Sequence, residues 1–555
     1  MQIIKKYQSN GKFVLHFFFL IVLLLGIFFR FTNLDHKVYW YDEAITSLRA
    51  SGYTEQEVVE KFSPNSVVSV TELQRYQHPD GTRNLVDTAK SLIKEDPQHP
   101  PLYYSLANIW FRIVGSSPAL ARFLPALLSL IAFPCAYWLC QELFIETGVF
   151  TSTLPTYLMM GLIAVSPFHV LFAQESRQYS LWAVTTLLTT AALLRAIRLN
   201  SRASWGLYIF TLVISFYTFL LTGWVMIAHA LYVMIICGFR NQKTIRSYFL
   251  ASVLSIVVFL PYAWILIVNQ SQANKGLSWA SRYSLKNSEL RDIWIQHLGR
   301  IFFDVNQAPW DFYVHRVLIV LTLYAFYRLC RQTPISVWLL IVLLTFASTL
   351  PLMIPDLISG GIRSTLARYM IPGLLAVQLA ITYLLGKNLT SPSLKSWYEK
   401  FWRLFLVILV TGSILSCVVT SQATVWYNKG HNGENMAVAK IINQATHPLL
   451  ISDASVGRLL SLSYSLNPTV KVLLQPRCAT CPIQSADTFR IQMPVVEKLE
   501  QFSDVFLYRY NPSKDWLNEL AKQQNYKFEP ISIRFPQGLK ERPVLWKVDS
   551  MKKAE

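Results

Sequence analysis

The sequence predicts a polytopic α-helical membrane protein with about eleven transmembrane helices and a C-terminal extracytoplasmic α/β domain. Of the 555 residues, 53% are hydrophobic and only 15% are charged, whereas soluble domains average about 25% charged residues. Apolar stretches of about 20 residues, long enough to cross a bilayer as helices, recur along most of the chain. This pattern stops near residue 420, and mixed polar sequence follows.

Ten apolar segments contain the expected spans. They are residues 13–31, 120–143, 154–172, 179–199, 205–239, 248–268, 314–327, 337–352, 369–385 and 405–419. Residues 205–239 are about twice the length of one span, so we expect two helices that turn back near residues 222–223. We expect residues 102–114 to form a short helix that lies on the outer face or dips into it.

Short basic loops set the orientation, because Lys and Arg are enriched on the cytoplasmic side of a membrane. The basic N-terminus and the loops at residues 195–202, 240–246, 328–331 and 387–403 all lie inside only if the chain has an odd number of spans. Eleven spans place the N-terminus inside and the C-terminus outside. These loops also explain the net charge of +19, which therefore does not indicate binding to nucleic acid.

In this topology, charged residues from four separate segments meet at the outer face. They are Asp42, Glu43, His99, Arg122, Glu175, Arg177, Arg363 and Arg368. Ionisable groups at a membrane boundary are costly unless they are paired or hydrated, so they usually mark a functional site. We expect an outer cavity lined by Asp42, Glu175 and Arg368. The alternative is structural: Glu175 and Arg177 could pair to close a hairpin, and His99 with two prolines could form only a rigid turn.

Several motifs, taken together, resemble a known family. The runs YWYDEA, HPPLYY, ARFLPALLSL, FAQESRQYSL and LARYMIP follow one another within residues 1–420. They resemble the GT-C superfamily of glycosyltransferases that use lipid-phosphate sugars, and within it the glycosyltransferase family 39-like branch, kin to protein O-mannosyltransferases and lipid A aminoarabinose transferases. This resemblance implies that Asp42, beside Glu43, is the catalytic base and that Glu175 is a second acidic group. It also matches Arg122, Arg368 and Tyr369 to family positions.

The sequence departs from this family in two places. Several relatives carry an Asp in the second outer loop, often farther along, where this chain has Glu175. The loop at residues 269–312 is too short for the large sugar-binding insertion of eukaryotic protein O-mannosyltransferases. We therefore expect a bacterial-type enzyme of the inner (plasma) membrane. The same loop mixes aromatic and charged residues, which fits either interfacial anchoring or a lid or sugar platform.

The residue types fit transfer of a hexosyl or pentosyl group from a polyprenyl-phosphate sugar to an acceptor hydroxyl. The departing phosphate needs cations, and Arg binds phosphate through two parallel hydrogen bonds. The candidates are Arg122, Arg177, Arg363 and Arg368, with Tyr369 beside the last. A single carboxylate can deprotonate the hydroxyl, and Asp42 is the expected base. Direct displacement inverts the anomeric configuration. The acceptor is a glycan, a lipid or a protein.

A divalent metal ion is a further expectation, because Glu43, His99 or Glu175 could hold one and stabilise the phosphate charge. No nucleotide cofactor is expected, since no glycine-rich phosphate loop follows the first strand of the C-terminal part. Glu43 could instead orient Asp42.

We divide the chain into a catalytic module, residues 1–420, which includes an outer loop at residues 32–100, and an α/β domain, residues 421–555. Helical patterns at residues 434–444, 454–464 and 513–524 alternate with strand patterns at 448–452, 470–475, 504–510, 527–535 and 544–548, which is typical of an α/β fold. Cys478 and Cys481 form a CxxC motif, for which a local disulfide or two thiols is expected rather than zinc.

Two other functions compete with the glycosyltransferase. A transporter or flippase of a glycolipid would use the charged residues as a translocation path, but such sites usually lie near the bilayer midplane. A non-catalytic scaffold would use the C-terminal domain to bind partners, which leaves Asp42, Glu43 and the arginines unexplained.

Overall fold

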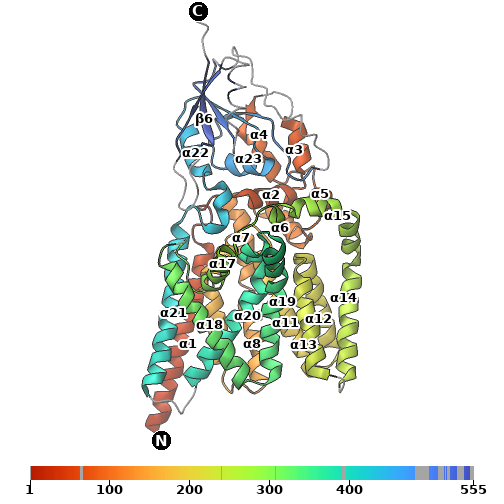
Figure 1. Ribbon diagram of the computed structural model, residues 1–555, viewed down its shortest axis with the longest axis vertical. Helices are drawn as coiled ribbons and strands as arrows, with labels where there is room; N and C mark the ends of the chain where they lie inside the picture. The colour runs from red at the N-terminus through yellow and green to blue at the C-terminus, as the bar shows by residue number, and fades with distance from the viewer. Residues whose placement is uncertain are drawn as a thin grey trace, which may run out of the picture.

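A bundle of long helices carries short helices and a β-sheet across one end, which we call the sheet end (Figure 1). The computed structural model describes residues 2–62, 67–238, 241–306, 308–390, 396–481, 499, 501–509, 518, 521, 526–533 and 543–550. The N-terminal end of the first helix lies at the opposite end of the bundle from the sheet.

Every apolar segment expected from the sequence contains a helix. The long and apolar helices are α1 (Gln2–Phe31), α7 (Pro118–Ser129), α8 (Ala132–Cys140), α9 (Leu154–Ala164), α10 (Pro167–Ala173), α11 (Tyr179–Leu199), α12 (Arg202–Thr218), α13 (Thr222–Cys237), α14 (Gln242–Val268), α18 (Asp311–Gln332), α19 (Ile335–Ser359), α20 (Ile371–Thr390) and α21 (Ser396–Gln422). A π-helical turn, Gln141–Ile145, extends α8. The expected break within residues 205–239 falls between α12 and α13.

Within the described residues, seven helical stretches are long and apolar enough to cross a membrane, and the bent pair α9–α10 would make an eighth. Shorter apolar helices occur at Leu15–Phe31 and Thr222–Cys237. The polytopic helical architecture is therefore confirmed. The number of eleven spans, and the orientation with the N-terminus inside and the C-terminus outside, stay predictions.

A bend of 58° separates α9 from α10, and this bend directs the chain toward the loop that carries Glu175. The break leaves backbone carbonyls without their helical donors, and such groups need other partners inside a membrane. Here the donor is Arg30, whose guanidinium donates to the carbonyl oxygens of Ile163 and Ala164 at 3.0 and 2.5 Å. Gly26 allows this close approach, because a Cβ atom there would lie 2.5 Å from the Ala164 oxygen.

Short helices cover the sheet end of the bundle. They are α2 (Tyr41–Ala50), α3 (Glu55–Phe62), α4 (Val70–Gln74), α5 (Leu85–Glu95), α6 (Leu102–Ile113), α15 (Gln270–Leu277), α16 (Trp279–Arg282) and α17 (Asn287–Arg300). Helix α6 is the short helix expected at residues 102–114. A 3₁₀ turn, Tyr427–Asn432, follows α21 and leads into the sheet region.

The C-terminal part contains the expected α/β pattern. Its helices are α22 (Asn435–Ile442) and α23 (Val456–Ser463), and its strands are β2 (Pro448–Ser452), β3 (Lys471–Leu474), β4 (Asp504–Tyr508), β5 (Tyr526–Pro530) and β6 (Leu545–Ser550). With β1 (Val68–Ser69) of the outer loop, the strand order is β1-β3-β2-β4-β6-β5, and β2 is parallel to both β3 and β4. Most of the helix expected at residues 513–524 lies outside the described residues.

The outer loop and the C-terminal part share one sheet. Strand β1 (Val68–Ser69) comes from the loop after α1 and pairs antiparallel with β3. Buried side chains of α2, such as Leu48, belong to the same hydrophobic core as Leu460 of α23. The boundary near residue 420 therefore joins two parts that pack against each other, and the division into two domains stays a prediction.

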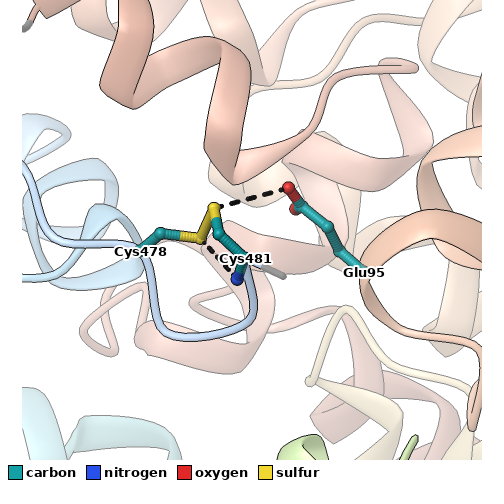
Figure 2. Close-up of side chains that lie close together, drawn as sticks. All are labelled: Glu95, Cys478 and Cys481. Atoms are coloured by element: carbon teal, nitrogen blue, oxygen red, sulfur yellow. Dashed lines mark hydrogen bonds between the residues drawn. A yellow bond between two sulfur atoms is a disulfide. The ribbon is translucent and has the colours of Figure 1, made fainter. Parts of the chain in front are cut away.

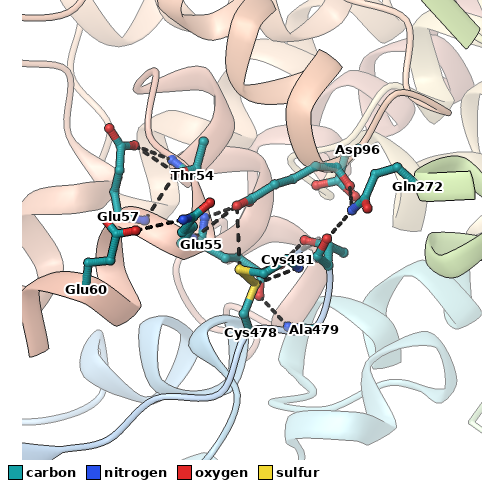
Figure 3. The surroundings of a disulfide bond; sticks show 12 residues. Thr54, Glu55, Glu57, Glu60, Asp96, Gln272, Cys478, Ala479 and Cys481 are labelled. Atoms are coloured by element: carbon teal, nitrogen blue, oxygen red, sulfur yellow. Dashed lines mark hydrogen bonds between the residues drawn. A yellow bond between two sulfur atoms is a disulfide. The ribbon is translucent and has the colours of Figure 1, made fainter. Parts of the chain in front are cut away.

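A disulfide between Cys478 and Cys481 closes a turn that packs on the outer loop (Figure 3). The carboxylate of Glu55 accepts hydrogen bonds from the Ala479 backbone N–H and the Thr480 hydroxyl, both at 2.9 Å. The side-chain amide of Gln272, on α15, donates to the Thr480 carbonyl. Of the two states expected for this CxxC motif, the structure has the disulfide, and its turn connects three segments that are distant in sequence.

Removing this disulfide tests whether the turn that it closes stabilises the folded protein. We expect the double variant Cys478→Ser/Cys481→Ser to lose about 2 kcal/mol of stability, since a short closed loop gives the low end of the usual disulfide contribution. Thermal unfolding with and without a reducing agent measures this. Reduction should lower the Tm of the wild type and leave that of the variant unchanged. An unchanged wild-type Tm would contradict a stabilising role.

Candidate functional site

Asp42 and Glu43 lie in the first turn of α2, which begins at Tyr41. Carboxylates are favourable there because the N-terminal end of a helix carries partial positive charge. The Glu43 carboxylate also lies 3.4 Å from the Trp40 backbone N–H, as in a capping box. The two adjacent acids nevertheless have different environments: Glu43 is fully buried, and the side chain of Asp42 is 22% exposed.

Glu43 is surrounded by donors from three other segments. Arg122 of α7 binds both carboxylate oxygens, with Nε to Oε1 and Nη2 to Oε2 at 2.7 Å. Lys429 Nζ donates to Oε2 at 2.7 Å, and the Ser176 backbone N–H donates to Oε1 at 2.9 Å. Burial raises the pKa of Glu43, but Arg122 and Lys429 outweigh it and hold the pKa at about 2.

Arg122 uses its other donors on the backbone. Its guanidinium donates to the carbonyl oxygens of Leu34, Lys37 and Val38 at 2.7–2.8 Å. All these partners are protein groups, and the side chain is 1% exposed. This geometry does not support the expected role of Arg122 in phosphate binding. It assigns Arg122 to holding the segment that leads from α1 into α2.

Asp42 contacts a different arginine. Arg368, in the 3₁₀ turn Ala367–Met370, places Nη2 3.3 Å from Asp42 Oδ2. Its guanidinium lies over the rings of Trp40 and Tyr179 at 5.2 and 5.5 Å. Arg368 Nε is buried and has no hydrogen-bond partner among the described residues. The base candidate and one phosphate-binding candidate are thus adjacent, as expected, and the arginine has an unused donor.

Arg177 and His99 form the next part of the site. Arg177 Nη1 donates to the hydroxyls of Thr46 and Tyr104 at 2.9 and 3.1 Å, and Nη2 lies 3.5 Å from His99 Nε2. Burial and Arg177 lower the pKa of His99 to about 4, so its imidazole is neutral. Within the described part of the chain, Arg177 Nε is buried without a hydrogen-bond partner.

Glu175 contacts the segment that follows the last long helix, α21. Its Oε2 accepts a 2.5 Å hydrogen bond from the side-chain amide of Asn428, and Oε1 is buried with no partner among the described residues. Burial raises the pKa of Glu175 to about 7, and nearby Glu43 acts in the same direction, whereas Lys429 opposes it. Glu175 is therefore a carboxyl group that titrates near neutral pH inside the site. It does not pair with Arg177 in the way a simple hairpin closure would require.

The remaining candidates are placed less centrally. Arg363 donates to the buried carboxylate of Asp356 at 2.9 Å and to the Gly360 carbonyl, so it stabilises the turn after α19. Tyr369 packs beside Arg368 and the ring of Phe219. A cavity lined by Asp42, Glu175 and Arg368 stays a prediction, since these side chains pack against their neighbours in the structure.

Sequence reasoning missed the segment after α21. Tyr427, Asn428 and Lys429 were assigned to the C-terminal domain, yet Lys429 is fully buried against Glu43 and Asn428 bonds to Glu175. A lysine at the outer end of the last span, beside aromatic residues, is the only signal that pointed there. That signal is weak, because lysines and aromatic residues both commonly flank transmembrane helices.

The residues expected to hold a metal ion do not form a suitable set. Glu43 accepts hydrogen bonds on both oxygens from cations and a backbone N–H. The group with metal-ligand spacing found among the described residues is Glu95 with Cys478 and Cys481 (Figure 2). Both sulfurs of this group are joined in the disulfide, so neither is a thiolate that could bind a metal. A metal dependence therefore stays a prediction.

Comparison with known proteins identifies the fold. No family model matches the sequence, and no curated protein matches it. Two solved structures of ArnT from Cupriavidus metallidurans, one bound to undecaprenyl phosphate and one in the apo state, are 14% and 13% identical, with TM-scores of 0.53 and 0.54. Each similarity covers 97% of this chain and 98% of that chain. An Archaeoglobus fulgidus oligosaccharyltransferase tethered to an acceptor peptide is 10% identical, covering 92% of this chain and 68% of that chain, with a TM-score of 0.48.

The chain thus shares the fold of the two ArnT structures over nearly its whole length. The GT-C-like helical fold expected from the sequence is confirmed.

The two acids of α2 should respond differently to neutralisation. Glu43→Gln leaves Arg122 and Lys429 buried without their counter-charge, and breaking such a pair costs about 3–5 kcal/mol. Asp42→Asn changes a part-exposed group and should alter stability much less. The Tm and the yield of folded protein after purification measure both effects. Equal losses in the two variants would contradict the structural role of Glu43.

The raised pKa of Glu175 predicts a pH-dependent stability. The pKa of Glu175 in the folded state, about 7, exceeds the ordinary value of 4.5. The stability that the protonated group contributes to the free energy of unfolding is therefore fully present below pH 4.5, and it is lost as the pH rises through 7. We expect Glu175→Gln to gain stability relative to the wild type as the pH increases over this range. Thermal unfolding of both proteins, with the exposed Glu60→Gln as control, measures this. A difference that is independent of pH would contradict it.

Proposed function

We propose that this chain is a membrane glycosyltransferase that moves a sugar from a polyprenyl-phosphate donor to an acceptor hydroxyl. The observation that carries the proposal is a pair of buried guanidinium groups, those of Arg177 and Arg368, close to the part-exposed carboxylate of Asp42. Each has an Nε without a hydrogen-bond partner among the described residues. A buried donor without a partner is costly, so these two groups favour an anionic ligand.

The phosphate of the donor binds to Arg177 and Arg368. Each has a buried Nε without a hydrogen-bond partner among the described residues, and guanidinium groups bind phosphate through paired hydrogen bonds. Tyr104 and Thr46 hold Arg177 in place, whereas Trp40 and Tyr179 flank Arg368. Arg122 is excluded from this set because its donors are already used.

Asp42 is the base. The acceptor oxygen attacks the anomeric carbon while its proton passes to the Asp42 carboxylate, and the bond from that carbon to the phosphate oxygen breaks. The polyprenyl phosphate leaves with the bonding electron pair, and its added negative charge is stabilised by Arg177 and Arg368. No general acid is needed, and the anomeric configuration inverts. Exposure of 22% leaves Asp42 accessible to an acceptor.

Glu43 positions the base instead of reacting. It joins α2 to Arg122 and Lys429 and thereby fixes the direction of the adjacent Asp42. Glu175 is a second acidic group in the site, and a proton on it near neutral pH limits repulsion with Asp42.

The ArnT structure bound to undecaprenyl phosphate supports the donor class, because it has the same fold. By analogy with such enzymes, we place the chain in a bacterial-type inner membrane, with the sheet end outside. The acceptor is a glycan, a lipid or a protein, and the sugar is a hexosyl or pentosyl group.

Sugar transfer by the reconstituted protein tests the proposal. We expect Asp42→Asn to reduce transfer from polyprenyl-phosphate sugars by about 10²–10⁴, the usual contribution of a general base, with an unchanged Tm. Asp35→Asn, an exposed carboxylate of the same loop, is the matched control and should retain full activity. Repeating the transfer assay with a chelator tests whether the reaction depends on a divalent metal ion.

Full activity of the Asp42→Asn variant would exclude Asp42 as the base. Movement of the donor across the membrane by the wild type, without transfer to any acceptor, would instead favour a flippase.

A further inference from the structure

A polar cavity lies at the junction of α17 and α18, and its lining does not include Asp42. Its volume is about 300 Å³, at the lower end of the range for small-molecule sites of about 300–1,000 Å³. Helix α17 contributes Asp292, Gln296 and Arg300, and the start of α18 contributes Asp311, His315 and Arg316. We call this space the α17–α18 cavity.

The inner wall of the α17–α18 cavity contains buried polar groups with unused hydrogen-bonding capacity. Arg300 is 4% exposed; its Nε lies 3.9 Å from the buried Asp304 carboxylate and has no hydrogen-bond partner among the described residues. His315 is 1% exposed; its Nε2 bonds to the Phe303 carbonyl at 2.8 Å, and its Nδ1 has no described partner. A neutral imidazole that donates from Nε2 presents Nδ1 as an acceptor. The wall therefore offers an unused donor and an unused acceptor.

The rim of the cavity is ordered by ion pairs. Arg316 lies 3.4 Å from Asp292 and its guanidinium lies over the ring of Phe312. Arg291, just outside the cavity, lies at the same 3.4 Å distance from Asp292. The lining contains two arginines and two aspartates, so its formal charges balance. A balanced set that offers both donors and acceptors suits a neutral, polyhydroxylated ligand better than a phosphate, which two carboxylates would repel.

A short chain of contacts joins this cavity to the proposed reaction site. The Arg300 guanidinium lies 3.7 Å from the centre of the Tyr427 ring. The next residue, Asn428, donates to Glu175 at 2.5 Å. Exposed aromatic residues, Trp310 and Tyr313, stand beside the cavity at the start of α18, as is usual at a membrane–water interface. A ligand in the cavity would therefore be connected to Glu175 through Arg300, Tyr427 and Asn428.

We propose that the α17–α18 cavity binds a saccharide unit of the acceptor. The term acceptor rests on the proposed function, whereas recognition of a neutral sugar rests on the cavity alone. Arg300 and Arg316 donate to sugar oxygens, while His315 Nδ1 and the aspartates accept from sugar hydroxyls. The acceptor is therefore a glycan or a glycolipid, and not an unglycosylated protein.

Saturation-transfer NMR tests this inference on the full chain in nanodiscs that contain no glycolipid and no sugar-headed detergent. The probes are methyl α-D-mannopyranoside, methyl α-D-glucopyranoside and N-acetyl-D-glucosamine, with inorganic phosphate as a competitor. We expect at least one sugar to bind saturably. Arg316→Gln and Asp311→Asn should weaken it by about tenfold, since each removes a hydrogen bond to a charged group. Arg282→Gln, an exposed arginine of α16 outside the cavity lining, is the matched control and should bind normally.

Asp42→Asn separates the two proposals, because it should reduce transfer by about 10²–10⁴ and leave sugar binding unchanged. Binding that survives Arg316→Gln and Asp311→Asn would overturn the inference, as would no binding of any of the three sugars. Displacement of the sugar by phosphate at equal concentration would also overturn it and identify an anion site. If Asp311→Asn fails to fold, Arg316→Gln on the rim still decides the outcome.

Discussion

The buried carboxylate of Glu43 is the constraint on which the site depends. A charge inside a protein is tolerated only when it is paired and hydrogen-bonded, and Glu43 meets this condition by drawing together four segments. They are α2, α7 through Arg122, the loop between α10 and α11 through Ser176, and the turn after α21 through Lys429. Arg122 in turn fixes three carbonyls of the chain that enters α2.

This anchor explains why two adjacent acids serve different purposes. Successive residues of a helix point about 100° apart, so a fixed Glu43 turns Asp42 toward Arg368. The groups near Asp42 are the neutral imidazole of His99 and the guanidinium groups of Arg177 and Arg368. Each guanidinium has an Nε without a hydrogen-bond partner among the described residues. The fold thus separates a carboxylate that holds four segments together from the part-exposed carboxylate that we propose as the base, and it leaves two guanidinium donors without a described partner beside the latter.

Much of the architecture could be predicted because it depends on local patterns. Apolar segments of span length predicted the long helices. The alternation of helical and strand patterns after residue 420 predicted β2, β3, β4 and α23 close to their observed bounds. The adjacency of Asp42 and Arg368 followed from placing both at one membrane face. These inferences needed only hydropathy, charge and the order of motifs.

The rest depends on contacts between distant residues, which a single sequence does not encode visibly. Arg122 looked like a phosphate ligand because its residue type fits, but three backbone carbonyls and Glu43 use its donors. Strand β1 has two residues, too short for any periodicity to reveal its pairing with β3. Lys429 and Asn428 follow the last span in sequence, and only the tertiary fold returns them to Glu43 and Glu175.

The most direct measurement is an electron cryo-microscopy structure of the chain in nanodiscs with undecaprenyl phosphate. We predict density for the phosphate within hydrogen-bond distance of Arg177 and Arg368, with Asp42 beside it and the contacts from Glu43 to Arg122 and Lys429 intact. Density for the phosphate at another place, or an Asp42 carboxylate directed away from it, would contradict the proposed mechanism.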